Sequence, residues 1–273
     1  MKVGQIMLDI IQILKFLIIF VYGCIIGSLS NMLIDRFIER ITLEEALEEG
    51  EEVPKGKKKH LYFKNFTYNC GCIRKGIALV PVLGYFLVKG KCPVCEKKIN
   101  IRYFVVELIT GVLFVVNVLV NKFNFVSFFY CLVIAALVIL TAVDFVKYEI
   151  PIEINYFILI IAIIVTIYDN ENFWQHVIGM FAVSLFTYGL MYFGGMGGGD
   201  VKLMAACGLL LGWKVIIVSF IAGCMLGSVI HSIRMVIEKE KSMLAFGPYL
   251  SMGVFVGMLY GPTIVEWYMG FFA

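Results

Sequence analysis

Residues 125–143 read FVSFFYCLVIAALVILTAV, and the next residue, Asp144, is the first charged one after them. About 20 consecutive apolar residues suffice to cross the hydrocarbon core of a bilayer as a helix. An ionisable side chain at membrane depth is costly and is a functional candidate by default. The stretch therefore predicts a membrane-spanning helix that ends at a carboxylate with a chemical role.

The composition of the whole chain agrees with this prediction. Of its 273 residues, 61% are hydrophobic and only 16% are charged, and the mean hydropathy is +0.92. A soluble domain has about 45–50% apolar and about 25% charged residues. We therefore expect an all-α polytopic membrane protein in contact with lipid, without a nucleic-acid partner. Eight segments are candidate spans, the last of them short and rich in glycine: 10–33, 103–120, 125–143, 152–168, 174–193, 215–236, 249–272 and 196–213.

The distribution of basic residues predicts the orientation of the chain. Of the 23 Lys and Arg residues, 14 lie in residues 36–102, the one long polar stretch. Basic residues near the ends of spans mark the cytoplasmic side. With this stretch inside and about eight spans, the acidic turn at 169–172 falls outside, and Asp144 and Asp200 both fall at the cytoplasmic face. The first apolar run is too long for a cleavable signal peptide.

The polar stretch divides the chain into a first span (1–35), a cytoplasmic insert (36–102) and a membrane domain (103–273). The insert opens with Thr42 and Glu45 in a capping-box pattern, which predicts that a separate helix begins at Thr42. The basic run at 55–59 has the composition of a solvated loop. A domain of fewer than 70 residues has a small core and needs a covalent or metal staple.

Four cysteines of the insert are candidates for that staple. Cys70 and Cys72 precede Cys92 and Cys95 by about 20 residues, and a cytoplasmic location disfavours a disulfide. Two close pairs at such a separation predict a four-thiolate zinc site. The single residue inside the first pair is an unusual spacing, and His60 is an alternative ligand. Free reduced thiols, or a disulfide if the orientation is inverted, stay open.

Asp144 and Asp200 are the two candidates for catalysis among the chain's five aspartates. Asp200 follows five glycines within residues 194–199, and such a bare backbone allows an extended peptide to approach closely. Two neighbouring carboxyl groups in a low dielectric share one proton, so one acts as base and the other as acid. The alternative is two separate interfacial carboxylates, with the glycines serving helix packing. Asp35, in contrast, is expected to be merely solvated at the interface.

The ordered motifs resemble those of the type IV prepilin peptidases, membrane aspartic peptidases of the Gly-x-Gly-Asp class. The motif that carries most of the resemblance is GGGDVKL at 197–203. The other matching segments are GSLSN at 27–31 with Arg36, PVL at 81–83, GKCPVC at 90–95, Arg102-Tyr103 with Glu107 and Gly111, Asp144 with Ile150-Pro151, and FGPYL at 246–250. Together they span most of the chain.

The resemblance implies a bifunctional enzyme of the bacterial inner membrane whose active site faces the cytoplasm. Asp144 and Asp200 would cleave the leader of a type IV prepilin or pseudopilin. The new N-terminus would then be methylated with S-adenosylmethionine. The family's first Cys-x-x-Cys pair would fall on Thr67 and Cys70, so the thiol of Cys72 departs from the pattern.

Two other functions remain open at this point. A non-enzymatic transporter or channel would use the aspartates to bind ions and would cleave no leader. A peptidase without methyltransferase activity is disfavoured by the cysteine insert, which peptidase-only relatives generally lack.

Overall fold

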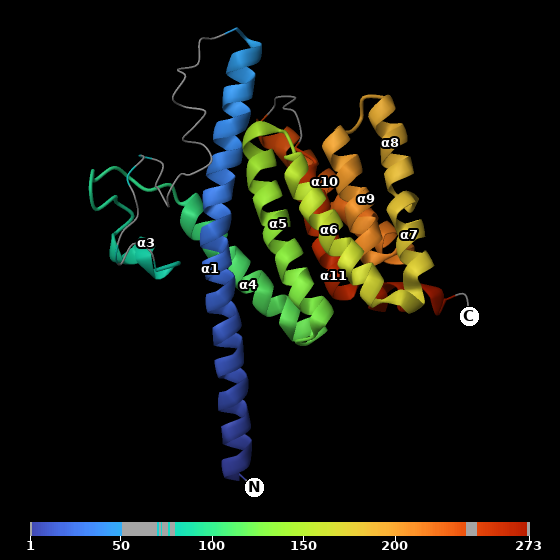
Figure 1. Cartoon of the computed structure of the whole chain (residues 1–273), viewed down its shortest axis with the longest axis horizontal. Helices are drawn as coiled ribbons and strands as arrows, with labels where there is room; N and C mark the ends of the chain where they lie inside the picture. Colours follow the sequence, from blue (N-terminus) through green and yellow to red (C-terminus); the bar gives the residue numbers. More distant parts are fainter. Residues whose placement is uncertain are drawn as a thin grey trace. The chain divides into compact units, whose positions relative to one another are not determined.

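The computed structural model describes residues 2–50, 70, 72, 76, 80–238 and 245–271. Within these residues, helices joined by turns and irregular segments make up the regular structure, apart from one isolated β-bridge between Lys91 and Lys98 (Figure 1). His60, Thr67 and the basic run at 55–59 lie outside the described residues. The chain divides into two compact units, residues 1–119 and 120–273. The division into a first span, an insert and a membrane domain stays a prediction.

The first unit contains α1 (Lys2–Glu48), the short α3 (Leu83–Leu87) and most of α4 (Arg102–Asn121). Small residues let α1 and α4 approach closely. A Cβ atom on Gly23 would lie 2.8 Å from Gly111 Cα, and one on Gly27 would lie 2.8 Å from Glu107 Cα. Close contact of this kind replaces the hydrophobic effect as the force that joins helices in lipid.

The prediction that a separate helix begins at Thr42 is wrong. α1 continues without a break to Glu48, and the Thr42 hydroxyl donates to the carbonyl of Ile38 at 2.7 Å, one turn earlier. No glycine or proline separates the apolar span from the acidic segment, so nothing ends the first helix before the second would begin.

The second unit contains α5 to α11. These helices are α5 (Phe125–Lys147), α6 (Ile152–Tyr168), α7 (Phe173–Ala182), α8 (Ser184–Tyr192), α9 (Gly198–Leu211), α10 (Trp213–Glu238) and α11 (Gly247–Met269), with a 3-10 turn at Asn170–Asn172. The short α9 is the central helix of the unit, because it contacts α6, α7, α8, α10 and α11. Its side chains at Leu203, Met204, Cys207 and Leu210 are almost completely buried.

The predicted span at 174–193 is broken into two helices. α7 ends at Ala182 and α8 begins at Ser184, and in Figure 1 the two continue one another along one edge of the unit. The Ser184 hydroxyl donates to the carbonyl of Met180 at 2.5 Å, and Thr187 donates to Val183 at 3.1 Å. Hydroxyl groups that bond to carbonyls of the preceding turn bend helices.

Within the described residues, five helices are long and apolar enough to cross a membrane, or six if α6 and the bent segment after it count as one broken span. The five are α1, α4, α5, α10 and α11. This confirms a polytopic membrane protein. The count of about eight spans and the cytoplasmic placement of the insert stay predictions.

Candidate active site and cysteine cluster

Asp144 lies in the last turn of α5 and is 4% exposed. The helix ends just after it, where Tyr148 adopts a left-handed conformation and its backbone N–H bonds to the Asp144 carbonyl at 2.9 Å. The carboxylate Oδ2 accepts a hydrogen bond from the backbone N–H of Gly247 at 3.0 Å. The first residue of α11 therefore holds a carboxylate that belongs to α5.

Asp200 lies in the first turn of α9 and is 6% exposed. Gly197 precedes the helix in an extended conformation, and its backbone N–H donates to Asp200 Oδ2 at 3.3 Å. The first turn of a helix stabilises a negative charge. The second oxygen, Oδ1, is buried and has no hydrogen-bond partner in the described part of the chain. It is therefore available to a water molecule or a substrate group.

The fold brings the two aspartates together, as the sequence analysis predicted. The segments that hold them are 56 positions apart in the sequence, and both contact Ile150. A Cβ atom on Gly199, beside Asp200, would lie 2.8 Å from Ile150 Cβ, and one on Gly247, which binds Asp144, would lie 3.2 Å from Ile150 Cδ1. Their helices meet through α11, which packs against both α5 and α9. Two buried carboxyl groups that can share one proton form an acid–base pair for the attack of water on a carbonyl carbon.

Sequence reasoning missed two residues that hold this pair. Gly247 was part of a quoted motif, but nothing in the sequence indicated that its backbone N–H binds Asp144. Asn155 in α6 is buried, and its side-chain Nδ2 donates to the Gly199 carbonyl at 3.1 Å. No pattern in the sequence singles out Asn155, because its partner is a backbone atom 44 positions away.

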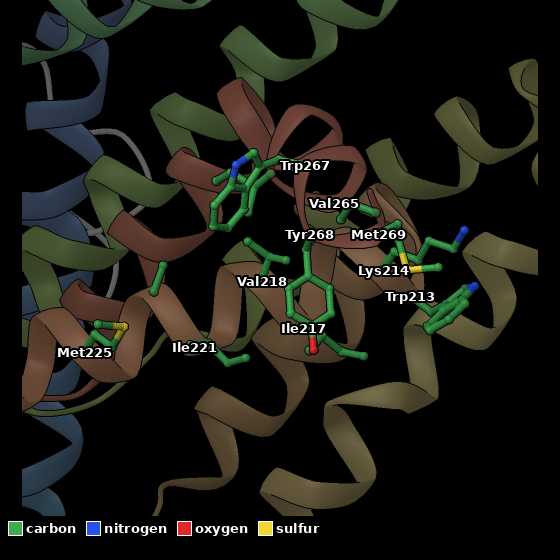
Figure 2. Close-up of a pocket in the computed structure, with 12 residues that line it drawn as sticks. Trp213, Lys214, Ile217, Val218, Ile221, Met225, Val265, Trp267, Tyr268 and Met269 are labelled. Carbon is green, nitrogen blue, oxygen red and sulfur yellow. The ribbon is translucent and has the colours of Figure 1, made fainter. Parts of the chain in front are cut away.

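A pocket in the second unit lies elsewhere (Figure 2). It measures about 500 Å³ and is lined by α10 and the end of α11, with Trp213 and Lys214 at one end and Met225 at the other. None of the predicted site residues lines it. About 25 Å of helix separates its α11 residues from Gly247, at 1.5 Å per residue. It is an apolar groove between two candidate spans and not part of the carboxylate site.

Polar residues of the first unit form a second network. The carboxylate of Asp35 in α1 pairs with the guanidinium of Arg102 and accepts a hydrogen bond from the Tyr103 hydroxyl at 2.7 Å. Asn31 Nδ2 donates to the Tyr103 carbonyl at 2.9 Å. The expectation that Asp35 is merely solvated is therefore wrong, because α4 supplies partners to both of its oxygens.

Glu107 is bound within the same unit. It is 4% exposed, and its Oε2 accepts a hydrogen bond from the backbone N–H of Val82 at 2.7 Å. Val82 has a positive φ of 61°, which is unusual for a β-branched residue. The carboxylate therefore fixes the strained turn that leads into α3.

The four insert cysteines converge as predicted. The Sγ atoms of Cys70, Cys72, Cys92 and Cys95 all lie within 4.8 Å of one another. In a tetrahedral site with Zn–S bonds of about 2.3 Å, the sulfur atoms are about 3.8 Å apart. A small contraction would therefore let the four thiolates hold a zinc ion. Cys92 is buried in a cluster with Ile99 and Tyr103, which joins the cysteines to the Asp35 network.

The thiols differ in acidity. Burial raises the pKa of Cys92, but hydrogen bonds from the backbone N–H groups of Cys95 and Val94 and from neighbouring thiols outweigh it, so the pKa falls to about 7. Hydrogen bonds with the thiols of Cys95 and Cys70 raise the pKa of Cys72 to about 12. Neighbouring groups thus stabilise the thiolate form of one cysteine close to neutral pH. A bound cation would stabilise the thiolate form of all four cysteines.

Two protein-family models match the chain. The model of the type IV leader peptidase family matches residues 131–232, and that of the bacterial peptidase A24 N-terminal domain matches residues 21–121. The first range includes Asp144 and Asp200, and the second includes the cysteine cluster and the Asp35 network. No solved structure matches the chain.

Characterised relatives match over most of the chain. Proteins named prepilin leader peptidase/N-methyltransferase from Aeromonas salmonicida (strain A449) and Legionella pneumophila are 27% and 26% identical to it, over 94% of this chain and 94% and 95% of their own lengths. One of the same name from Bacillus subtilis (strain 168) is 28% identical over 70% of this chain and 79% of its own length.

Proposed function

The chain belongs to the type IV leader peptidase family, and from this premise we propose that Asp144 and Asp200 are the pair with which it removes prepilin leaders. Cleavage of prepilin leaders and N-methylation are the two activities in the relatives' names. The comparisons give no support to the alternative of an ion-binding transporter. The assignment is supported by two buried carboxyl groups whose segments both contact Ile150, one of them directly after a glycine-rich stretch.

Hydrolysis needs one proton on the pair. The ionised carboxyl group takes a proton from water while the water oxygen bonds to the carbonyl carbon, and the protonated group gives its proton to the carbonyl oxygen. The resulting diol collapses: the ionised carboxyl group takes a proton from one diol hydroxyl as the carbonyl re-forms, the C–N bond breaks, and the protonated carboxyl group gives its proton to the leaving amine, so the pair again holds one proton. Oδ1 of Asp200 is suited to accept from water because it has no partner within the described residues.

The glycine-rich segment before Asp200 is suited to receive the substrate. Gly194 has a φ of +74°, and a Cβ atom on Gly198 would meet only Met191 Sδ, at 3.4 Å. A backbone without side chains allows an extended peptide to lie close to the carboxyl groups. We expect the apolar N-terminal helix of a prepilin or pseudopilin to lie among the spans and its charged leader to stay in the cytoplasm.

The orientation of the site belongs to the same proposal. The basic stretch at 36–102 argues for its own placement in the cytoplasm. With about eight spans, the end of α5 and the start of α9 then face the cytoplasm as well. This gives a multi-pass protein of the bacterial inner membrane whose catalytic pair lies on the side where prepilins are made.

S-adenosylmethionine supplies the methyl group for the second activity, the methylation of the new N-terminal amine. Asp35 and Glu107 are not the groups that would hold this cofactor, because they already bind Arg102, Tyr103 and Val82. The role of these groups is therefore to position α1, α3 and α4.

The cysteine cluster fits zinc, and we assign it a structural role. Four thiolates close the coordination shell and leave no open position for substrate, as in structural zinc sites. Zinc would cross-link a small insert whose described core includes Cys92, Ile99 and Tyr103. The extra thiol of Cys72 stands in for the family's missing one at Thr67.

The proposed function is tested with the purified protein in lipid and a synthetic prepilin, with and without S-adenosylmethionine, read by mass spectrometry. We expect loss of the leader, and with the cofactor a mass gain of one methyl group on the new N-terminus. If the folded protein cleaves none of several prepilins, the proposal is wrong. If it cleaves without methylating, only the methyltransferase part is wrong.

A further inference from the structure

We propose that Ile150 and Asn155 are positioning residues that set the place of Asp200 relative to Asp144, an inference that rests on the proposed catalytic role of the pair. Ile150 lies in the link just before α6, and Asn155 lies in the first turn of α6, which carries neither aspartate. Ile150 contacts the segments that hold the two carboxyl groups, and Asn155 binds the peptide unit that leads into Asp200.

Ile150 packs between two glycines. A Cβ atom on Gly199 would lie 2.8 Å from Ile150 Cβ, and one on Gly247 would lie 3.2 Å from Ile150 Cδ1. Gly199 precedes Asp200, and Gly247 donates the hydrogen bond to Asp144. One side chain therefore spaces the backbone on both sides of the catalytic pair. Because cores are densely packed, a change in its volume shifts the segments it touches.

Asn155 fixes the orientation of the same backbone. Its Nδ2 donates to the Gly199 carbonyl at 3.1 Å, and that carbonyl belongs to the peptide unit whose nitrogen is Asp200 N. The asparagine side chain is 4% exposed, so water cannot replace it without rearrangement. The peptide plane sets the direction in which the Asp200 side chain leaves the backbone. Asn155 therefore acts on Asp200 without touching it.

Pro151 restricts the backbone of the link that carries Ile150. It is the N-cap of α6 and lies between Ile150 and the first helical turn. Its ring fixes φ, which reduces the freedom of the link between α5 and α6. The link follows the last turn of α5, which contains Asp144, and places Ile150 against both glycines. Asn155 then lies in the first turn of α6, where it binds Gly199.

The same pair of helices offers a matched control. Thr166, also in α6 and 3% exposed, donates to the carbonyl of Leu209 in α9 at 3.1 Å. The two bonds are of the same kind, because each runs from a buried α6 side chain to a backbone carbonyl of α9. Eleven residues, or about 16 Å of helix, separate Thr166 from Asn155. A general loss of packing between α6 and α9 would therefore lower the cleavage rate in variants of either residue.

The test is the steady-state kinetics of leader cleavage by full-length Asn155→Leu and Thr166→Val in lipid. A misplacement of about 1 Å near the chemistry can cost 100-fold in rate. We expect Asn155→Leu to lower kcat by about 10- to 100-fold with KM within about twofold of wild type, and Thr166→Val to keep kcat within about threefold. A kcat for Asn155→Leu close to that of wild type, or an equal fall in both variants, would overturn the proposal.

A milder variant covers the case in which Asn155→Leu does not fold. Ile150→Val removes one methylene from the contact with the two glycines, and we expect kcat to fall several-fold while the melting temperature changes by only a few degrees. An unchanged kcat in this variant would contradict the role of Ile150. Failure of the proposed function would give a different result. Asp144→Asn and Asp200→Asn would then keep cleaving the leader, whatever the cleavage rates of the Asn155 and Ile150 variants.

Discussion

The backbone N–H of Gly247 donates a hydrogen bond to Asp144 Oδ2 across 103 positions of the sequence, at 3.0 Å. A Cβ atom at position 247 would lie 2.6 Å from that same oxygen and 3.1 Å from Leu140 Cδ2. The glycine is therefore required for space and not for an unusual backbone angle. The start of α11 belongs to the proposed active site as much as the two helices that carry the aspartates.

Gly247→Ala should therefore impair cleavage. The added methyl group displaces the Asp144 carboxylate or the start of α11, and we expect cleavage to fall about 10- to 100-fold. Gly189→Ala is the control, because a Cβ atom at Gly189 in α8 meets nothing within 4 Å. Rates of leader cleavage in lipid measure both. Equal activity of Gly247→Ala and wild type would contradict the close contact.

Replacing Cys92 and Cys95 by serine should remove bound zinc. We expect about one zinc per chain in the wild type, by elemental analysis of protein purified without added metal, and almost none in the double variant. Cys224→Ser, in α10 and outside the cluster, should keep the metal. A wild-type protein without zinc would refute the site, and cleavage by the double variant would show that the metal serves the insert and not the carboxylate pair.

Tyr103→Phe should destabilise the first unit. The variant leaves the partly buried Asp35 carboxylate with one partner fewer, and hydrogen bonds to charged groups contribute about 1.5–3 kcal/mol. We expect a lower midpoint of thermal unfolding in detergent. Tyr22→Phe, at an exposed tyrosine of α1, should leave the midpoint unchanged. Equal midpoints for Tyr103→Phe and wild type would show that the hydroxyl bond contributes nothing to stability.

The sequence predicted the features that depend on rare residues in an apolar background. Asp144 and Asp200 stood out because carboxylates are few in these helices, and the cysteines because thiols in two close pairs are a pattern in themselves. The structure brings each set together. Membrane-spanning helices were also predictable, because an apolar run of sufficient length has few other stable environments.

The features that sequence reasoning missed depend on backbone partners or on distant charges. Gly247 and Asn155 act through a backbone N–H and a backbone carbonyl, which no side-chain pattern reveals. Asp35 finds Arg102 67 positions away, so its ion pair could not be read from its neighbours. The local capping signal at Thr42 failed because a continuing helix satisfies the same backbone groups that a cap would satisfy.

The most direct test of the central claim is the cleavage of a synthetic prepilin by Asp144→Asn and Asp200→Asn, each purified in lipid beside wild type. Asp169→Asn is the matched control, because Asp169 lies at the other end of α6 and binds Asn172 and His176. We predict that both active-site variants are folded and lose cleavage, by at least about 100-fold, since general acid–base catalysis contributes about 100- to 10,000-fold. The control should cleave at nearly the wild-type rate. Substantial cleavage by either active-site variant would contradict the assignment of the catalytic pair.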